Sequence, residues 1–341
     1  MSDFKTVIDF ESTFSCTHNC LYCYNWWKAH GEKMPLELDT NKTLKILEKA
    51  IQEMKPNRFV FSGGEPFLRP DIHELIEFVH SKKIPITIIS NGSLINEKEL
   101  KFCKKNGVDM FEFTLLSSKR EIHNQLANVK GDFSAFDKAL IATQKAIQHK
   151  IDVAHVFVAT KQNIQTIEET LALSYALGVR HFLFNRFNPA GNGFLNLNQL
   201  QISPNEIAKA LEIAQNFIQT HPSFRISCAV NIHPCLVDLS RYKGIKFTYC
   251  GVKKGQTVYL LDMLGNIRLC AFARTNVGNI LTQSFDEIIN SDKAHAYFEA
   301  VPKKCLGCDL IKLCQGGCKA SADNCFLNPN QADDWLKKYK P

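Results

Sequence analysis

The chain has 341 residues, a formal net charge of +7 and 45% hydrophobic residues. This length suits one large α/β domain with a smaller one, and the composition excludes a disordered or low-complexity chain. No apolar run is long enough to span a membrane, and Lys5, Asp9 and Glu11 interrupt any signal-peptide core. We therefore expect a cytoplasmic protein. Its scattered Lys and Arg residues predict neither a nucleic-acid partner nor a membrane partner.

Short β-branched or aromatic runs alternate with helix-periodic segments from residue 4 to about 220. The expected strands are 4–10, 58–61, 85–90, 110–116, 152–159 and 180–187. The expected helices are 40–55, 71–82, 96–106, 133–149, 163–177 and 204–220. Five β–α–β returns of this length imply a parallel sheet with right-handed crossovers. Six such strands can curl into a partial (β/α)6 barrel of the TIM type, with its ligand site at the C-terminal ends of the strands.

A CxxxCxxC loop, formed by Cys16, Cys20 and Cys23, follows the first strand. Thirteen cysteines in a reducing compartment favour metal ligation over disulfides. Three thiolates from one loop can hold three irons of a 4Fe–4S cube and leave the fourth iron open for chemistry. A structural zinc site usually has four ligands in paired CxxC knuckles, so zinc or incidental thiols are the alternatives. Tyr22 adds an aromatic face beside the loop.

Small polar motifs follow the later strands, and we expect them to meet the cysteine loop at the same end of the sheet. The carboxylate of Glu65 suits an amino group, Ser90 and Asn91 can reach a ribose, and Arg186 can bind a carboxylate bidentately. Each motif alone is only a turn signal. The candidate cofactor-binding residues are Tyr22, Gly63, Gly64, Glu65, Pro66, Ser90, Asn91, Ser117 and Arg186.

Together, the cysteine loop, the Gly-Gly-Glu-Pro segment and the Ser-Asn-Gly segment resemble the radical S-adenosylmethionine (SAM) enzymes over residues 4–200. The resemblance implies a cluster whose open iron chelates the amino and carboxylate groups of SAM. It also implies that the Gly-Gly-Glu loop contacts the methionine amine, and that polar groups from later strands hold the ribose and carboxylate. In this family, one electron cleaves SAM, and the 5′-deoxyadenosyl radical removes a hydrogen atom from the substrate.

A second cysteine array occupies the C-terminal third of the chain. Its members are Cys250, Cys270, Cys305, Cys308, Cys314, Cys318 and Cys325. The alternating segments 258–261 and 267–269 flank Gly265 and predict a β-hairpin that brings Cys250 and Cys270 together. On spacing alone, an all-thiolate zinc site is as good an explanation as a cluster.

The intervals of this array resemble those of the SPASM extension found on a branch of radical SAM enzymes. The resemblance implies two auxiliary 4Fe–4S clusters, and so three clusters in all. The first would take Cys250, Cys270 and Cys318, and the second would take Cys305, Cys308, Cys314 and Cys325. The first is one ligand short, because Gln256 lies where some members carry a further cysteine. The missing ligand is Cys235, Cys228, a non-cysteine group or an open site.

Three cysteines remain outside the two arrays. Cys103 lies in an amphipathic helix and is expected to be a small buried residue. Cys228 and Cys235 lie between barrel and SPASM region, and our hypothesis gives one of them a catalytic or ligating role. A purely structural role is the alternative for both. The expected domains are the barrel over 1–220, a bridging segment over 221–249, and a SPASM domain of hairpin and helices over 250–341.

SPASM enzymes act mostly on peptides and proteins, so the resemblance implies crosslinking, epimerisation or oxidation of a peptide. Ala271 follows the hairpin's second cysteine, where formylglycine-forming members carry an Asp, and Asp262 is a conceivable substitute. Few residues precede Cys16, so leader recognition is expected from a separate protein or from the catalytic body. The alternatives are a dehydrogenase, epimerase or tetrapyrrole-modifying enzyme, and an iron–sulfur electron-transfer or scaffold protein. The basic charge suggests an acidic flavodoxin or ferredoxin as electron donor.

Overall fold

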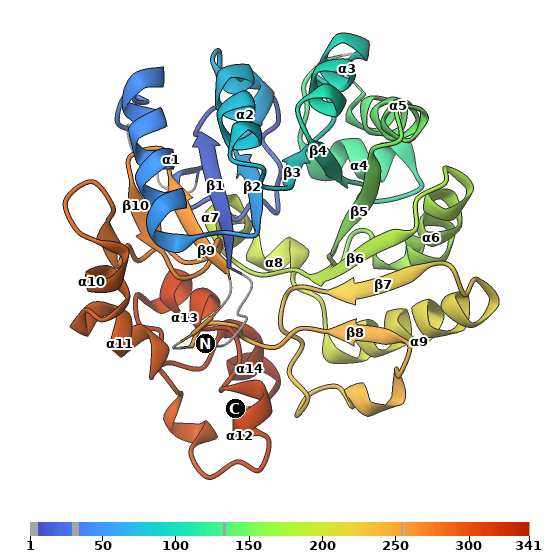
Figure 1. The fold of residues 1–341 in the computed structure, drawn as a ribbon. Coiled ribbons are helices and arrows are strands. Elements are labelled where there is room, and N and C mark those ends of the chain that lie inside the picture. Colours follow the sequence, from blue (N-terminus) through green and yellow to red (C-terminus); the bar gives the residue numbers. More distant parts are fainter. Residues whose placement is uncertain (1–5, 29–33, 132–133, 254, 257, 341) are drawn as a thin grey trace.

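The computed structural model describes residues 6–28, 34–131, 134–253, 255–256 and 258–340. One sheet of eleven strands runs through this part of the chain, in the order β11-β10-β9-β1-β2-β3-β4-β5-β6-β7-β8 (Figure 1). The strands are β1 Val7–Thr13, β2 Arg58–Gly63, β3 Ile86–Ser90, β4 Val108–Thr114, β5 Asp152–Ala159, β6 His181–Arg186, β7 Arg225–Cys228, β8 Ile245–Phe247, β9 Val258–Asp262, β10 Asn266–Arg268 and β11 Gly278–Asn279.

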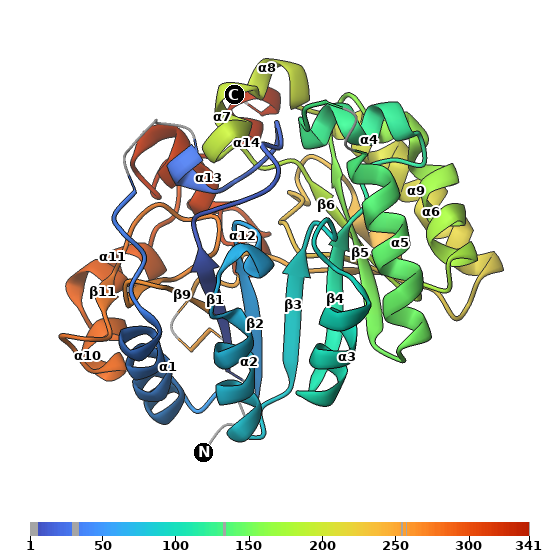
Figure 2. The same ribbon diagram turned by 90° about the horizontal axis from the view of Figure 1, so that it is seen from above.

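The helices between consecutive parallel strands cover the outer side of the curved sheet (Figure 2), and further helices follow the last strand, β11. The helices are α1 Thr40–Met54, α2 Ile72–Ser81, α3 Glu97–Lys105, α4 Arg120–Ala127, α5 Ala135–Gln148, α6 Ile167–Ala176, α7 Gly191–Leu195, α8 Leu197–Leu200, α9 Pro204–Thr220, α10 Phe285–Ile289, α11 Asp292–Phe298, α12 Ile311–Cys314, α13 Lys319–Phe326 and α14 Asp334–Tyr339. None of the described helices is long and apolar enough to cross a lipid bilayer.

Alternation along the strands gives the sheet two different faces. On β1, Ile8 and Phe10 are fully buried and belong to the same apolar core as Leu47 of α1. Asp9 and Glu11 occupy the intervening positions and therefore face the inside of the curved sheet. The apolar face packs against the helices, and the other face lines the inside of the curved sheet.

The expected fold class, a partial barrel of parallel strands followed by a cysteine-rich segment, is confirmed. Each expected strand and helix coincides with an observed one within a few residues, although residues 4, 5 and 133 lie outside the described part. The 221–249 segment is more than a bridge, because it contributes the parallel strands β7 and β8. Periodicity missed these strands because they have only four and three residues.

The hairpin of β9 and β10 joins the barrel's own sheet. β9 pairs with β1 in parallel register, and β10 returns antiparallel to β9. Hydrogen bonds from Asp262 fix the turn, because its Oδ1 accepts from the backbone amides of Leu264 and Asn266, each at 2.9 Å. The cysteine-rich C-terminal segment is thereby anchored beside the strand that leads into the CxxxCxxC loop.

Candidate active site and cluster sites

The three cysteines of the first loop lie together at the C-terminal end of β1. Burial, followed by the nearby Cys23 and Cys16 thiols, raises the pKa of Cys20 to about 12. Lys28 lies close enough to all three thiols to lower their pKa values, and its Nζ donates to the His18 carbonyl at 2.7 Å. Three grouped thiols beside one cation fit an anionic cluster, because the cation offsets the thiolate charge.

The Gly-Gly-Glu-Pro loop packs directly onto the cysteine loop. The backbone amides of Gly64 and Glu65 donate to the carbonyls of Thr13 and Ser15, each at 2.8 Å. A Cβ at Gly64 would stand 1.9 Å from the Ser15 carbonyl oxygen, and Gly63 has a φ of +112°. Only glycine allows this close approach. Pro66 is buried and begins the short 3-10 turn Pro66–Leu68.

Glu65 ties the second-strand loop to the third-strand loop. Its carboxylate is fully buried and accepts from the Ser90 hydroxyl and the Asn91 amide, both at 2.9 Å. The Asn91 Nδ2 in turn donates to Thr17 Oγ1 at 3.0 Å and lies 3.9 Å from Cys16 Sγ. Glu65 therefore positions the loop that contacts the cysteines, a role that the spacing of the motif did not predict.

The buried Glu65 carboxyl makes stability depend on pH. Burial raises its pKa from 4.5 to about 7, while hydrogen bonds from Asn91, Ser90 and Phe67 lower it. The native protein keeps this proton to higher pH than the unfolded chain, so the free energy of unfolding falls between about pH 4.5 and pH 7. We expect Glu65→Gln to remove roughly 3 kcal/mol of that fall. Urea unfolding at both pH values, at equal iron content, measures it; an unchanged pH dependence in the variant would contradict it.

Residues after β6 support the cysteine loop from the opposite side. Gly191 has a φ of +50°, and a Cβ there would lie 2.2 Å from the Asn25 carbonyl oxygen. The Gly193 amide donates to the Cys23 carbonyl at 3.1 Å, and Asn192 Nδ2 donates to Asn19 Oδ1 at 2.8 Å. Sequence reasoning missed this support, and its only signal was the Gly-Asn-Gly triplet after the sixth strand.

Arg186 does not have the role expected from sequence. It is 1% exposed, its Nε donates to the Asn231 carbonyl at 2.8 Å, and its guanidinium lies 3.4 Å from Asp333 and over the Trp335 ring. These partners commit the guanidinium to the C-terminal segment, so it is not free to bind a carboxylate of SAM. The sequence could not show this, because the partners Asp333 and Trp335 lie almost 150 residues away.

A side chain just after β6 is available for a ligand. Asn188 follows β6 and is 3% exposed, yet neither its amide oxygen nor its amide nitrogen has a hydrogen-bond partner among the described residues. A buried amide without a partner is costly, so this position suits a contact with a bound molecule.

Two other expected cofactor contacts have partners of their own. The Ser117 hydroxyl lies 2.9 Å from Thr166 Oγ1 and accepts from the Lys119 amide at 2.9 Å. Tyr22 lies beside Cys20, and burial, followed by that thiol, raises the pKa of its hydroxyl well above the usual range. Tyr22 thus borders the cysteine loop as expected, whereas the fully buried Ser117 is engaged with its own protein neighbours.

Carboxyl groups line the interior of the curved sheet. Burial is the first cause that raises the pKa of Asp9 to about 6, and those of Glu11 and Glu112 to about 7. Glu11 forms a buried ion pair with Arg268 of β10. Carboxyls whose pKa lies near neutrality can take up or release a proton during a reaction. Sequence reasoning had considered only Asp262, whose oxygens are committed to the hairpin turn.

The first auxiliary set comes together as the hairpin predicts. Burial raises the pKa of Cys270 to about 12 and that of Cys318 well above its usual range, and Cys250 lies near both thiols. The buried Lys319 lies near Cys250, and its Nζ donates to the carbonyls of Val252 at 3.0 Å and Phe298 at 2.5 Å. Three neighbouring thiols with a nearby cation repeat the features of the first loop.

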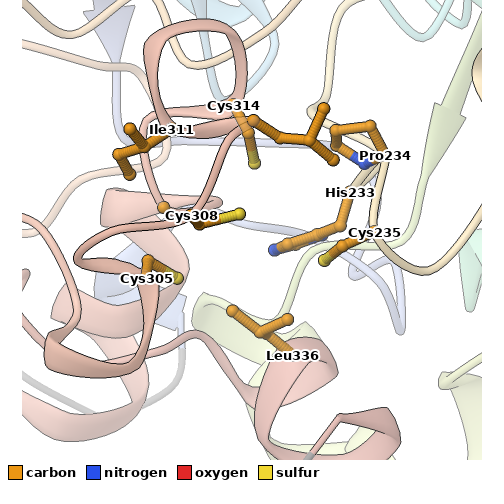
Figure 3. Close-up of a pocket in the computed structure, with 10 residues that line it drawn as sticks. His233, Pro234, Cys235, Cys305, Cys308, Ile311, Cys314 and Leu336 are labelled. Atoms are coloured by element: carbon orange, nitrogen blue, oxygen red, sulfur yellow. The ribbon is translucent and has the colours of Figure 1, made fainter.

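One pocket brings together three thiols of the expected second auxiliary set and one thiol from outside that set. Cys305, Cys308 and Cys314 line a small pocket together with Cys235 (Figure 3). Cys325 does not line it: its Sγ lies on α13, 4.0 Å from the Pro189 carbonyl oxygen. The thiol that joins the other three in the pocket is therefore the one from the 221–249 segment.

Cys228 lies in the apolar core, where its surroundings favour the structural alternative. It is 1% exposed and packs in the apolar cluster that surrounds β5, β6 and β7. Burial is the one cause that raises its pKa, and no other cysteine contributes to the shift. Cys103 is likewise fully buried in the main apolar core, as expected.

Two family models match the chain: the radical SAM superfamily over residues 10–174, and the SPASM iron–sulfur cluster-binding domain over residues 250–319. The chain therefore belongs to the radical SAM superfamily. Within that superfamily it carries a SPASM domain, which makes it a radical SAM/SPASM enzyme. The cofactors expected from its sequence, SAM and 4Fe–4S clusters, are those that these two families imply.

Relatives of the chain act on different kinds of substrate. The AdoMet-dependent heme synthase of Nitratidesulfovibrio vulgaris is 24% identical, over 98% of this chain and 92% of its own length. Mycofactocin maturase MftC of Mycolicibacterium smegmatis is 25% identical, over 94% and 79%. The structure of Streptococcus suis SuiB bound to precursor peptide SuiA has a TM-score of 0.74 at 17% identity, covering 97% of this chain and 76% of that one. The likeness to SuiB shows the fold alone.

Proposed function

We propose that this protein is a radical SAM oxidoreductase that modifies a peptide or protein by crosslinking, epimerisation or oxidation. The proposal rests on the gathering of Cys16, Cys20 and Cys23 with Asn91 and Glu65 at one end of the sheet. These three thiols would hold the SAM-binding cluster. When bound, the cluster and SAM supply a one-electron cleavage whose 5′-deoxyadenosyl radical removes a hydrogen atom from the substrate.

The protein's own groups would position SAM and the substrate. The Asn91 amide lies between Cys16 and Thr17, where it can orient the polar end of SAM beside the cluster. The unpartnered amide of Asn188 is the second group that we assign to ligand binding. The near-neutral carboxyl of Glu112 can accept a proton that the substrate loses during oxidation.

Two carboxyls of the interior favour a peptide over a polycarboxylate. Above their raised pKa values, Asp9 and Glu112 would repel the propionate groups of a tetrapyrrole, whereas they can accept hydrogen bonds from peptide amides or pair with a basic side chain. The heme synthase relatives, which match nearly the whole chain, make a tetrapyrrole-modifying enzyme the second candidate. The site loops count against a mere electron-transfer or scaffold role, since electron transfer needs no SAM contacts.

Incubating the enzyme with each of the two substrate classes in turn tests the proposal. The iron-loaded, reduced enzyme is incubated anaerobically with SAM and either short peptides encoded next to its gene or a metalloporphyrin carrying propionates. We expect a mass change in a peptide, matched by formation of 5′-deoxyadenosine. A mass change confined to the porphyrin would contradict the peptide proposal and favour the second candidate.

We propose that an acidic flavodoxin or ferredoxin delivers electrons at the pocket lined by Cys305 and Cys308. Leu306 is 67% exposed and Leu313 is 47% exposed beside it. Exposed lysines, together with one aspartate, surround these leucines: Lys303, Lys304, Lys312, Lys340 and Asp309. An apolar patch with a net basic rim suits an acidic redox partner.

Reversing charge on this rim is expected to slow reduction by the protein donor. The double variant Lys303→Glu, Lys312→Glu should lower flavodoxin-driven formation of 5′-deoxyadenosine about tenfold at low salt, with no change when dithionite is the reductant. The matched control is Lys98→Glu, Lys101→Glu on α3, which Figure 1 places at the opposite end of the molecule from α12. Equal slowing in both double variants would show that net charge alone matters.

We propose that the barrel spans residues 1–220 and that the SPASM domain spans residues 250–341. The segment 221–249 between them carries the strands β7 and β8. A reducing compartment such as the cytoplasm suits the thirteen cysteines, for which the described residues show no disulfide.

A further inference from the structure

We propose that Cys235 is the fourth thiolate of the second auxiliary cluster, in place of Cys325. The inference rests on the proposed function, in which the SPASM segment binds two such clusters. It changes the ligand set that the spacing implies, because one ligand comes from the loop after β7. The cluster then links that loop to the C-terminal segment.

The loop that carries Cys235 is held firmly against the C-terminal segment. The His233 carbonyl accepts from the amides of Leu236 at 2.9 Å and Val237 at 3.1 Å, which closes a turn around Cys235. The His233 ring is fully buried, and its Nε2 lies 2.9 Å from Asp333 Oδ2. Asp333 also accepts from the Cys318 amide at 3.0 Å. The position of Cys235 is thus set by buried polar contacts.

The other side of the pocket is formed by the segment from Cys305 to Gly317, which carries three of the four thiols. The Cys308 amide donates to the Cys305 carbonyl at 3.2 Å, and the chain continues into α12, which ends at Cys314. Gly316 and Gly317 follow with φ values of +83° and +102°. Hydrogen bonds from their backbone amides lower the pKa of the Cys314 thiol, against burial, which raises it. Successive amides that converge on a sulfur are a feature of iron–sulfur sites.

The pocket itself places Cys235 with these three thiols. It is lined by all four, and its remaining wall is mostly apolar, with Ile311 and Leu336 among its residues (Figure 3). No other cysteine of the described residues joins this pocket.

Cys325 belongs to different surroundings. Its thiol is near the Pro189 carbonyl, and after burial Asp334 is the next cause that raises its pKa, to about 12. No cysteine is among the causes of its shift. Cys318 and Cys325 stand at the two ends of α13, about 10 Å apart along the helix axis. Cys325 therefore lies at the end of α13 that is near Pro189, a residue of the barrel region.

Four thiolates can also hold a single zinc ion, with each sulfur about 2.3 Å from the metal. Zinc and iron contents therefore distinguish a zinc site from a 4Fe–4S cube.

The test compares three single variants of the anaerobically reconstituted full chain: Cys235→Ala, Cys325→Ala and Cys308→Ala. Iron, sulfide and zinc content are measured, together with the EPR spectrum of the reduced protein. We expect about twelve irons in the parent and in Cys325→Ala. Cys235→Ala should match Cys308→Ala, with up to about four irons lost, or an altered EPR signal of one cluster where the irons are retained.

The opposite pairing, in which Cys325→Ala matches Cys308→Ala and Cys235→Ala matches the parent, would overturn the inference. So would equal losses in Cys235→Ala and Cys325→Ala, no loss in either, or a parent with one zinc and about eight irons. If Cys235→Ala fails to fold, Cys235→Ser must show the altered EPR signal. These readouts need no substrate, so failure of the peptide proposal would leave them interpretable.

Discussion

Replacing Cys20 by alanine is expected to lower formation of 5′-deoxyadenosine from SAM at least about a thousandfold. Cys20 is one of the three grouped thiols, and we propose that it holds one iron of the SAM-binding cluster. Without that ligand the cluster is lost or misplaced, whereas the two auxiliary sets are formed by other residues. Iron content should fall from about twelve to about eight per chain.

Cys103→Ala is the matched control for the Cys20 variant. It also removes a buried thiol, but this thiol lies on α3 in the main apolar core. We expect Cys103→Ala to keep its full iron content and its SAM cleavage. Retention of SAM cleavage by Cys20→Ala, or loss of the same four irons in both variants, would contradict the assignment of the first loop.

Among substitutions near the site that add only one methyl group, we expect Gly64→Ala to lower stability and cluster loading the most. The new Cβ would stand 1.9 Å from the Ser15 carbonyl oxygen and 3.1 Å from that of Phe14, both of them backbone atoms that cannot turn aside. The cysteine loop must therefore move away from the Gly-Gly-Glu-Pro loop. We expect a loss of about 3 kcal/mol or more in stability, and failure to load the first cluster.

Thermal unfolding and iron content measure the Gly64→Ala effect. Gly251→Ala serves as control, because a Cβ at Gly251 would meet nothing within 4 Å and its φ lies outside the left-handed region. Its melting temperature should equal that of the parent. A Gly64→Ala protein with normal stability and twelve irons would show that the two loops do not need their close contact.

Sequence reasoning performs well where one short segment carries the information. The period of the hydrophobic residues predicts the six barrel strands and their helices, because burial of one face determines that period. The cysteine loop and the two glycines of the next loop are likewise local. Gly64 is needed because of a contact with Ser15, yet its place after a strand was enough to single it out.

Sequence reasoning fails where a side chain's partner lies far along the chain. Arg186 suited a carboxylate of SAM, but Asp333 and Trp335 engage it from a segment that no local pattern connects to β6. Cys235, and not Cys325, lines the pocket with Cys305, Cys308 and Cys314, and family spacing cannot show which thiol the folded chain brings there. The acidic interior was also missed, because Asp9 and Glu112 meet only when the sheet curves.

Reductive cleavage of SAM by the parent protein tests the central claim most directly. The anaerobically reconstituted protein, with about twelve irons, is reduced by dithionite and given SAM, and both products are quantified by mass spectrometry. The account predicts 5′-deoxyadenosine and methionine in equal amounts, formed only when SAM and reductant are both present. Failure of the fully iron-loaded, reduced protein to form either product would contradict it.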